Sequence, residues 1–240
     1  SFHLAPLCHF FLFLNLVSTF RGAPHKNGNF IKSTTRPHNG WWSSAVFAEP
    51  GYIYLAYGLA QGVAIEKVTD DFSSTLWTTT LSNCTDYVSA MSVDSENNLF
   101  VRGTTGVGGV GYNQYTAKIN GANGDLIWER IYDSGYQDFG GGLTVDPANN
   151  VLVIGSTEYE TGSKDKTGIL MIKYDGSDGT ELEYILYRKS LGDERFEVAC
   201  GIVRDSNGNI YISGKEYDIS NGEGCGIETR RALTMKYAPI

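Results

Sequence analysis

The chain has 240 residues, of which 41% are hydrophobic and 19% charged, and its net charge is −8. Residues 1–40 contain four basic residues and no Asp or Glu, which leaves 15 basic and 27 acidic residues in 41–240, a net charge of −12. A domain this acidic repels a phosphate backbone, so nucleic acid is excluded as an expected partner. The 29 glycines, 15 tyrosines and 11 phenylalanines indicate an all-β protein, because aromatic residues suit half-buried strands and glycine suits turns.

The N-terminus has features of a secretory signal. Leu7–Val17 is an apolar run too short to span a bilayer as a helix, and small residues follow it. We therefore expect residues 1–23 to be a signal or processing segment, and the protein to be secreted or at the cell surface. The chain does not begin with Met and has no Lys or Arg ahead of the run, so the alternative for residues 1–20 is an inner strand of an upstream blade.

A hairpin pattern then recurs along the chain. Its copies are Ala45–Gly58, Ala90–Gly103, Gly142–Gly155 and Gly201–Gly214. Each copy has a short strand, a turn with Asn or Gly where φ > 0 is needed, and a strand rich in Val, Ile and Tyr. Asp94, Asp146 and Asp205 open three of these turns, where an Asp side chain can accept hydrogen bonds from backbone N–H groups. Their spacing lacks a full calcium ligand set.

A second hairpin follows in each unit, marked by residue pairs that stand ten positions apart. The pairs are Lys67 and Trp77, Lys118 and Trp128, and Lys173 and Glu183. Four strands in about 50 residues, repeated, are typical of β-propeller blades. We expect four-stranded antiparallel blades at residues 41–83, 84–134, 135–192 and 193–240, the last without its outer strand.

Closure of the ring has two interpretations. Residues 24–40 are expected to be a linker, in which Asn27–Lys32 resembles the turn and outer strand at Asn123–Trp128. Pairing of this segment with the last blade would close a four-blade ring and remove an exposed edge. The alternative is that the chain is a fragment of a larger ring.

Several short motifs connect these units to a known family. They are Asp86-Tyr87, Asp138-Phe139, Val93-Asp94, Val145-Asp146, Asp205–Gly214, Ala117-Lys118 and Lys173-Tyr174. In these motifs the units resemble the SBBP-type β-propeller repeat of secreted bacterial proteins, over about residues 41–240. The resemblance implies a propeller but no activity, because that family is defined by its scaffold. Lys118–Trp128 is also similar to the docking repeat of quinoprotein dehydrogenases, but Asn120 and Asn123 depart from it, so no cofactor is expected.

Function is expected at the links between the two hairpins of each unit, which lie opposite the hairpin turns. These links, Thr104–Asn113, Ser156–Gly168 and Lys215–Arg231, differ in length and composition, and variable loops on a rigid scaffold concentrate recognition. Aromatic residues expected there are Tyr112, Tyr136, Phe139, Tyr159, Phe196 and Tyr217. Such rings suit a polysaccharide or protein ligand, or they pack between blades.

Catalysis is not expected. All four histidines precede residue 41, so residues 41–240 cannot build a Ser-His-Asp relay or a His-ligated metal site. We therefore expect a non-catalytic binding or scaffold module without metal. The alternatives are a fragment of a carboxylate-based carbohydrate-active enzyme and a structural, adhesin-like repeat array.

Two modifications are also predicted. A Cys200–Cys225 disulfide would close a loop of about 25 residues and leave Cys84 over, whereas a cytosolic protein would keep all three thiols reduced. Asn83-Cys84-Thr85 is a sequon, which makes Asn83 a glycosylation site if the source glycosylates secreted proteins.

Overall fold

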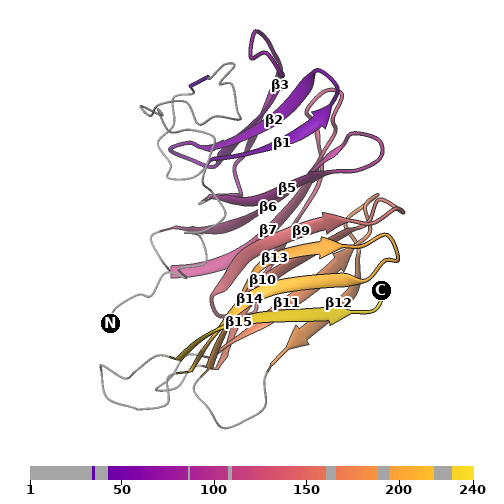
Figure 1. The fold of residues 1–240 in the computed structure, drawn as a ribbon. Coiled ribbons are helices and arrows are strands. Elements are labelled where there is room, and N and C mark those ends of the chain that lie inside the picture. The colour runs from indigo at the N-terminus through magenta and orange to yellow at the C-terminus, as the bar shows by residue number, and fades with distance from the viewer. Residues whose placement is uncertain are drawn as a thin grey trace, which may run out of the picture.

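The structure is a computed structural model, described here for residues 34–35, 43–85, 87–107, 110–160, 166–188, 195–218 and 229–240. The described residues form fifteen β-strands (Figure 1). No helix among them is long and apolar enough to cross a membrane. The expected signal segment and the expected ring-closing strand at Asn27–Lys32 lie outside the described residues.

The strands form four antiparallel blades, which confirms the predicted all-β propeller class. Blade 1 contains β1 (Ser43–Glu49), β2 (Tyr52–Gly58), β3 (Val63–Thr69) and β4 (Thr75–Leu81). Blade 2 contains β5 (Val88–Val93), β6 (Leu99–Val107), β7 (Val110–Ile119) and β8 (Leu126–Tyr132). Blade 3 contains β9 (Asp138–Val145), β10 (Val151–Glu160), β11 (Lys166–Tyr174) and β12 (Glu181–Tyr187). Blade 4 contains β13 (Arg195–Arg204), β14 (Ile210–Asp218) and β15 (Thr229–Tyr237).

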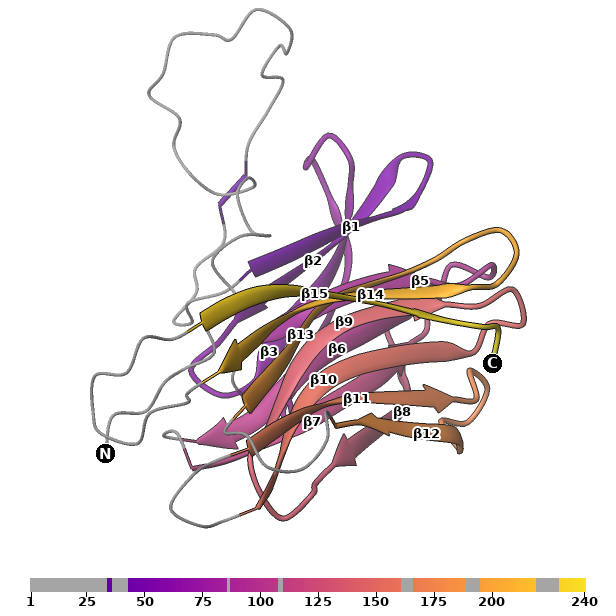
Figure 2. The same cartoon turned by 60° about the horizontal axis from the view of Figure 1, so that its bottom comes forward.

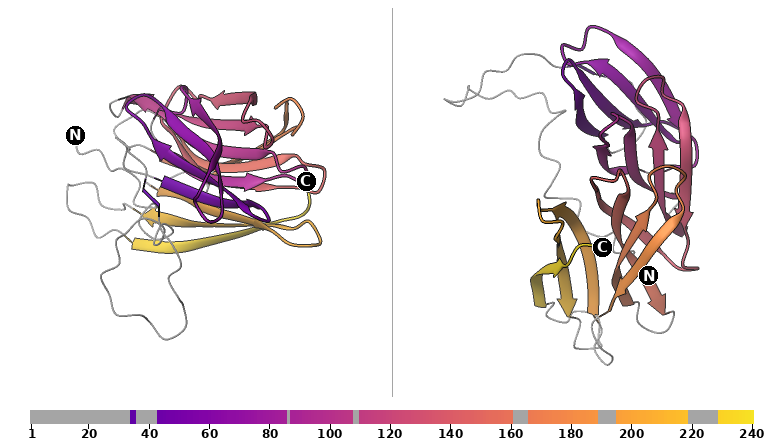
Figure 3. Two further views of the ribbon diagram at one scale, coloured as in Figure 1. Left: turned by 90° about the horizontal axis from the view of Figure 1, so that it is seen from above. Right: turned by 90° about the vertical axis from the view of Figure 1, so that its right-hand side faces the viewer.

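The blades follow one another around an arc (Figure 3). The first strands of successive blades contact one another, β1 with β5, β5 with β9 and β9 with β13. A single parallel pair, Thr167 with Phe196, joins blades 3 and 4 into one seven-stranded sheet. Figure 2 shows the three strands of blade 4 side by side.

The predicted Asp turns are confirmed. Asp94 Oδ1 accepts the backbone N–H groups of Glu96 at 2.9 Å and Asn98 at 2.8 Å. Asp146 accepts the equivalent pair from Ala148 and Asn150, both at 2.9 Å. Asp205 repeats the arrangement. One residue in each of these turns has φ > 0, namely Asn97, Asn149 and Gly208, as such turns require.

The links between hairpins are much shorter than predicted. Thr104 and Thr105 pair with Gln114 and Asn113, so most of the expected glycine-rich link is a continuation of β6 and β7. Strands also extend into the two other predicted links, since β10 reaches Glu160, β11 begins at Lys166, β14 reaches Asp218 and β15 begins at Thr229. Thr and Tyr have high β propensity, and continued pairing satisfies backbone groups that a loop would leave to water.

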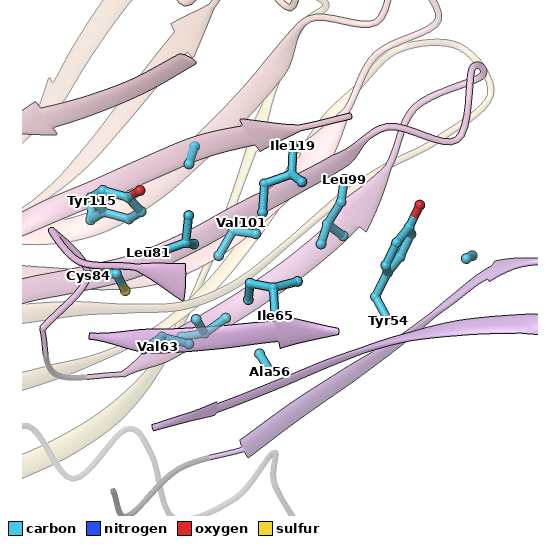
Figure 4. Packing of buried hydrophobic residues seen from close by; sticks show 13 residues of the cluster. Tyr54, Ala56, Val63, Ile65, Leu81, Cys84, Leu99, Val101, Tyr115 and Ile119 are labelled. Carbon is cyan, nitrogen blue, oxygen red and sulfur yellow. The ribbon is translucent and has the colours of Figure 1, made fainter. Parts of the chain in front are cut away.

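The middle strands of blade 3 are buried on both faces. In β10, Val151 and Val153 join a cluster with blade 2, whereas Leu152 and Ile154 join a cluster with blade 4. Alternate side chains of a strand point to opposite faces, so the unbroken apolar run Val151–Ile154 follows from having a blade on either side. Figure 4 shows the equivalent packing between blades 1 and 2.

A lysine on the third strand joins each blade to the next. Its ammonium pairs with an acid of its own blade, Lys67 with Glu49 at 2.7 Å, Lys118 with Asp94 at 2.9 Å, and Lys173 with Asp146 at 3.1 Å. It also donates to a main-chain oxygen of the following blade, Lys67 to Gly121 at 2.9 Å, Lys118 to Gly176 at 2.8 Å, and Lys173 to Ile240 at 2.8 Å. These contacts fix the angle between neighbouring blades.

A tryptophan opposite this lysine strengthens the first two junctions. Trp77 pairs in register with Lys67, and Trp128 with Lys118, which confirms the significance of the ten-residue spacing. Each indole N–H donates at 3.2 Å to the oxygen that the lysine binds. The Trp128 ring also packs on Gly179, where a Cβ would lie 2.8 Å from the ring, so only glycine allows this approach.

Candidate functional site

The antiparallel blades bring several strand ends together on one face of the arc. We call this face, which all the blades share, the loop end. It comprises the junctions between β6 and β7, β10 and β11, and β14 and β15, together with the starts of β9 and β13. The turns at Asp94, Asp146 and Asp205 lie at the opposite end. Five of the six predicted aromatic positions fall within two residues of a strand terminus at the loop end, and Tyr136 lies in the link from β8 to β9.

The structure brings two of the predicted rings into contact. Tyr112 of blade 2 and Phe139 of blade 3 have ring centroids 5.7 Å apart and an interplanar angle of 40°. Both residues are half-buried. Gly106 makes room for this pair, since a Cβ there would lie 2.8 Å from Tyr112 Cδ1. The pair therefore joins two blades and also presents aromatic surface at the loop end.

The other predicted rings are arranged separately. Tyr159 lies against Arg188, whose guanidinium carbon is 4.3 Å from the ring centroid. Tyr136 is half-buried, and its backbone N–H donates to Ser134 Oγ at 3.2 Å. The backbones of Phe196 and Tyr217 pair in register on β13 and β14, but their side chains lie outside what the structure describes.

Asp138 precedes Phe139 at the start of β9 and is fully buried. Its Oδ2 accepts the Ser134 backbone N–H at 2.8 Å, which ties down the link that carries Tyr136. Burial raises the pKa of Asp138, and hydrogen bonds from Thr157 and Ser134 offset only part of that rise. Its Oδ1 has no hydrogen-bond partner among the described residues. The role of this carboxyl is therefore to position the link.

A buried polar contact between blades 2 and 3 was missed by sequence reasoning. Arg102 is fully buried and donates to the carbonyls of Gly103 at 3.0 Å and Tyr115 at 2.9 Å, and to Gln114 Oε1. Burial lowers its pKa to about 10. The Gln114 amide lies against Gly155, where a Cβ would be 2.3 Å from Nε2. Arg102 occupies the repeat position that Ile154 occupies in blade 3. An arginine in place of an apolar residue was the feature of the sequence from which this buried contact could have been predicted.

Two further buried carboxylates occur in blade 4. Glu197 and Glu216 pair directly across β13 and β14 and are 1% and 4% exposed. The Arg231 guanidinium is 3.7 Å from Glu216. Glu197 stands eight residues before Asp205, as Asp138 stands eight before Asp146, so alignment of the repeats could have predicted a buried acid there. Neither carboxylate is accessible to an external substrate.

With this geometry in view, the chain can be compared with known proteins. Residues 115–158 match the family model of the SBBP β-propeller repeat. The chain contains an SBBP repeat. The matched segment runs from β7 to β10, so it includes Phe139 and Asp138 and spans the junction between blades 2 and 3. No curated protein sequence matches the chain.

Two solved structures resemble this SBBP-containing chain. One is an endo-1,4-β-xylanase from Bacteroides thetaiotaomicron VPI-5482, with 12% identity and a TM-score of 0.42 over 82% of this chain and 78% of the other. The second is a GH43_12 protein retrieved from capybara gut metagenome, with 14% identity and a TM-score of 0.45 over 82% of this chain and 39% of the other. At these identities and TM-scores, neither likeness carries an argument about function.

The remaining predicted positions lie around the SBBP repeat. Cys200 is disulfide-bonded, and its predicted partner, Cys225, lies outside the described residues. Cys84 is fully buried, and its thiol donates to Tyr87 O at 3.5 Å. Asn83 is exposed, with its amide donating to Glu129 at 2.7 Å, and its glycosylation stays a prediction. The described residues contain no group of three or more His, Cys, Asp or Glu that could hold a metal ion.

Proposed function

We propose that this chain is a non-catalytic β-propeller module that binds a polysaccharide at its loop end. The Tyr112–Phe139 pair supports the proposal, because two half-buried rings with centroids 5.7 Å apart offer an aromatic surface that spans two blades. An aromatic ring can stack on the apolar face of a sugar, while the tyrosine hydroxyl can hydrogen-bond to sugar hydroxyls. Because the rings come from different blades, the rigid junction between blades sets their spacing.

The burial of the acids supports binding over hydrolysis. A glycosidase needs two carboxyl groups that flank the sugar bond on opposite sides. Asp138, Glu197 and Glu216 are at most 4% exposed, and the latter two are neighbours on adjacent strands of one blade. These three acids are thus closed off from an external substrate.

Export is part of the same proposal. Cys200 is disulfide-bonded, and disulfides persist in oxidising compartments such as the periplasm or the outside of the cell. A polysaccharide ligand would also be encountered in these compartments. A module that acts outside the cell gains from a rigid scaffold whose last blade is covalently restrained.

Binding can be tested by affinity gel electrophoresis against xylan, mannan, β-glucan and dextran. We expect at least one of these polysaccharides to retard the full chain. Tyr112→Ala and Phe139→Ala should each weaken that retardation about tenfold, which corresponds to about 1.4 kcal/mol for a lost aromatic contact. Tyr184→Ala is the matched control, because Tyr184 also forms an aromatic pair between blades 2 and 3, with Tyr132 at 6.0 Å, but on the outer strands.

Three outcomes would contradict the proposal. The first is retardation by none of the four polysaccharides, and the second is equal loss in Tyr184→Ala and Tyr112→Ala. The third is release of reducing sugar from a bound polysaccharide, which would favour the enzyme-fragment alternative.

A further inference from the structure

Tyr132 and Tyr184 form a close pair across the junction between blades 2 and 3. Tyr132 ends β8, the outer strand of blade 2, and Tyr184 lies in the middle of β12, the outer strand of blade 3 (Figure 2). Their hydroxyl oxygens are 3.2 Å apart and share a hydrogen bond. The ring centroids lie 6.0 Å apart, with an interplanar angle of 35°. Two phenols from different blades are thus held side by side.

The strands that carry these rings are fixed relative to each other. Each tyrosine lies on a strand that pairs in register with the third strand of its own blade. Arg130, two residues before Tyr132, donates through Nε to Gly179 O at 2.9 Å and through Nη2 to Asp178 O at 2.7 Å. Gly179 and Asp178 lie in the turn that leads into β12. The contact between the two hydroxyls therefore rests on strands and a tight turn.

The pair combines exposure to solvent with a second phenol within hydrogen-bond distance. Tyr184 is 42% exposed, and Tyr132 is half-buried. Other tyrosines are placed differently. Tyr54 and Tyr115 are fully buried, and their hydroxyls donate to Asn97 O and Glu129 Oε2, both at 2.7 Å. A small oxidant in solution can therefore reach the Tyr132–Tyr184 pair but not these buried rings.

We propose that Tyr132 and Tyr184 are a site of oxidative cross-linking, at which a dityrosine bond joins blade 2 to blade 3. The oxidant required is hydrogen peroxide acting through a peroxidase. Each Cε carbon of a tyrosine is bonded to the carbon that bears the hydroxyl. Contact between the two hydroxyls therefore brings the carbons that couple in dityrosine within reach of each other. This reaction needs no ligand at the loop end.

The reaction removes two electrons and two protons from the pair. Each phenol loses one electron and its hydroxyl proton, which gives a radical shared between the oxygen and the Cε carbons. A bond then forms between one Cε of Tyr132 and one Cε of Tyr184. The C–H bonds at these two carbons break, and their protons return to the phenol oxygens. One hydrogen peroxide takes up the two electrons and two protons and becomes two waters.

The cysteines are compatible with this chemistry. Cys200 is disulfide-bonded, and disulfides persist in oxidising compartments. Cys84 is fully buried, so its thiol does not compete with the exposed phenols for oxidant. Dityrosine is a carbon–carbon bond, which thiols do not reduce. The cross-link therefore differs from the disulfide of blade 4 in being permanent once it forms.

Treatment of the full chain with a peroxidase and hydrogen peroxide tests the proposal. The protein is kept dilute to disfavour bonds between separate chains, and treated and untreated samples are both reduced before digestion. We expect mass spectrometry to recover residues 132 and 184 in one pair of linked peptides, lighter by two hydrogen atoms than the separate peptides together. Dityrosine fluorescence should appear and should persist after reduction.

Phenylalanine variants identify the phenols that react. Tyr132→Phe and Tyr184→Phe keep the ring packing but remove one phenol, so each should abolish the linked peptides. Tyr211→Phe is the matched control, because Tyr211 is also half-buried but its hydroxyl lies 3.2 Å from Asp205 Oδ2. This control should keep the wild-type yield. Treated wild type should also unfold at a higher urea concentration than treated Tyr184→Phe, because a covalent link restrains the unfolded chain.

Four results would overturn the proposal. They are absence of the linked peptides, an equal yield of dityrosine in Tyr184→Phe, bonds formed only between separate chains, and a larger yield at another pair of tyrosines. The last two would mean that collision between exposed rings, and not the contact built into the junction, decides where the bond forms.

Discussion

Asp94 connects a local turn to the junction between two blades. Its Oδ1 accepts two backbone N–H groups of its own turn, while Oδ2 lies 2.9 Å from the Lys118 ammonium. Lys118 in turn donates to Gly176 O of the next blade. The same carboxyl therefore stabilises a hairpin and holds the cation that joins blade 2 to blade 3.

Replacement of Asp94 should show how much this connection contributes. Asp94→Asn leaves a buried ammonium without its ion pair, and we expect the free energy of unfolding to fall by about 3 kcal/mol. Asp205→Asn is the matched control with a smaller loss, since Lys236, the blade 4 counterpart of Lys118, is exposed and not ion-paired among the described residues. Urea unfolding measures both, and equal losses would contradict a role for the ion pair.

Two aspartates should affect the pH dependence of stability with opposite sign. Burial raises the pKa of Asp94, but hydrogen bonds from Lys118 and Asn98 outweigh it and leave the pKa below its ordinary value. The stability that Asp94 contributes is therefore present above about pH 4 and lost as pH falls through its folded pKa. Burial leaves the pKa of Asp138 raised, so its contribution is present below about pH 4 and lost as pH rises through its folded pKa.

Urea midpoints between pH 3 and pH 7 check both signs. The deficit of Asp94→Asn relative to the wild type should shrink as the pH falls below about 4. The midpoint of Asp138→Asn should rise relative to the wild type as the pH increases, because the amide stays neutral and keeps an acceptor for Ser134. Parallel curves for the three proteins would show that these pKa shifts do not govern stability.

At the scale of elements, the turn between the third and fourth strands of one blade is a docking point for the preceding blade. Gly179 has φ +75°, and a Cβ there would lie 2.8 Å from the Trp128 ring. Gly135 has φ +83° with no atom within 4 Å of that position. The two glycines thus share a left-handed backbone, which glycine adopts without strain, but differ in contact with a neighbouring blade.

Alanine at these two positions separates the two effects. Gly135→Ala should cost about 1 kcal/mol from the left-handed backbone alone. Gly179→Ala adds overpacking against Trp128, so we expect a total loss of about 3 kcal/mol. The measurement is again urea unfolding. A loss in Gly179→Ala no larger than in Gly135→Ala would mean that the junction adjusts without cost.

For the whole molecule, the parts of the fold that depend on local chemistry were predictable. The repeated Asp turns and the ten-residue Lys–Trp spacing specify hairpins within one blade, and the structure confirms both. The prediction that Thr104–Asn113 is a loop was wrong. It was based on the glycines there, but the strands continue to pair through most of this segment.

The candidate site was predictable only in part. The predicted ends of the strands gave the approximate positions of the aromatic residues. The contact between Tyr112 and Phe139, however, depends on how blade 2 packs against blade 3. The burial of Glu216 also depends on which faces meet. Such contacts between units are set by packing that no single repeat encodes.

Among the described residues, the larger contacts between blades all join neighbours along the arc, so a local change in one blade should stay local. Cys200 lies on β13 in the last blade and is disulfide-bonded, whereas blade 1 is three blades away. Reduction should therefore speed hydrogen exchange in β13–β15 strongly and leave β2 and β3 nearly unchanged.

A bridge that closes a loop of about 25 residues contributes about 3 kcal/mol, which is the loss of stability expected on reduction if Cys225 is the partner. Cys200→Ala should exchange like the reduced wild type and show no further response to reductant. Equal acceleration in all four blades would instead mean that the arc unfolds as one cooperative unit.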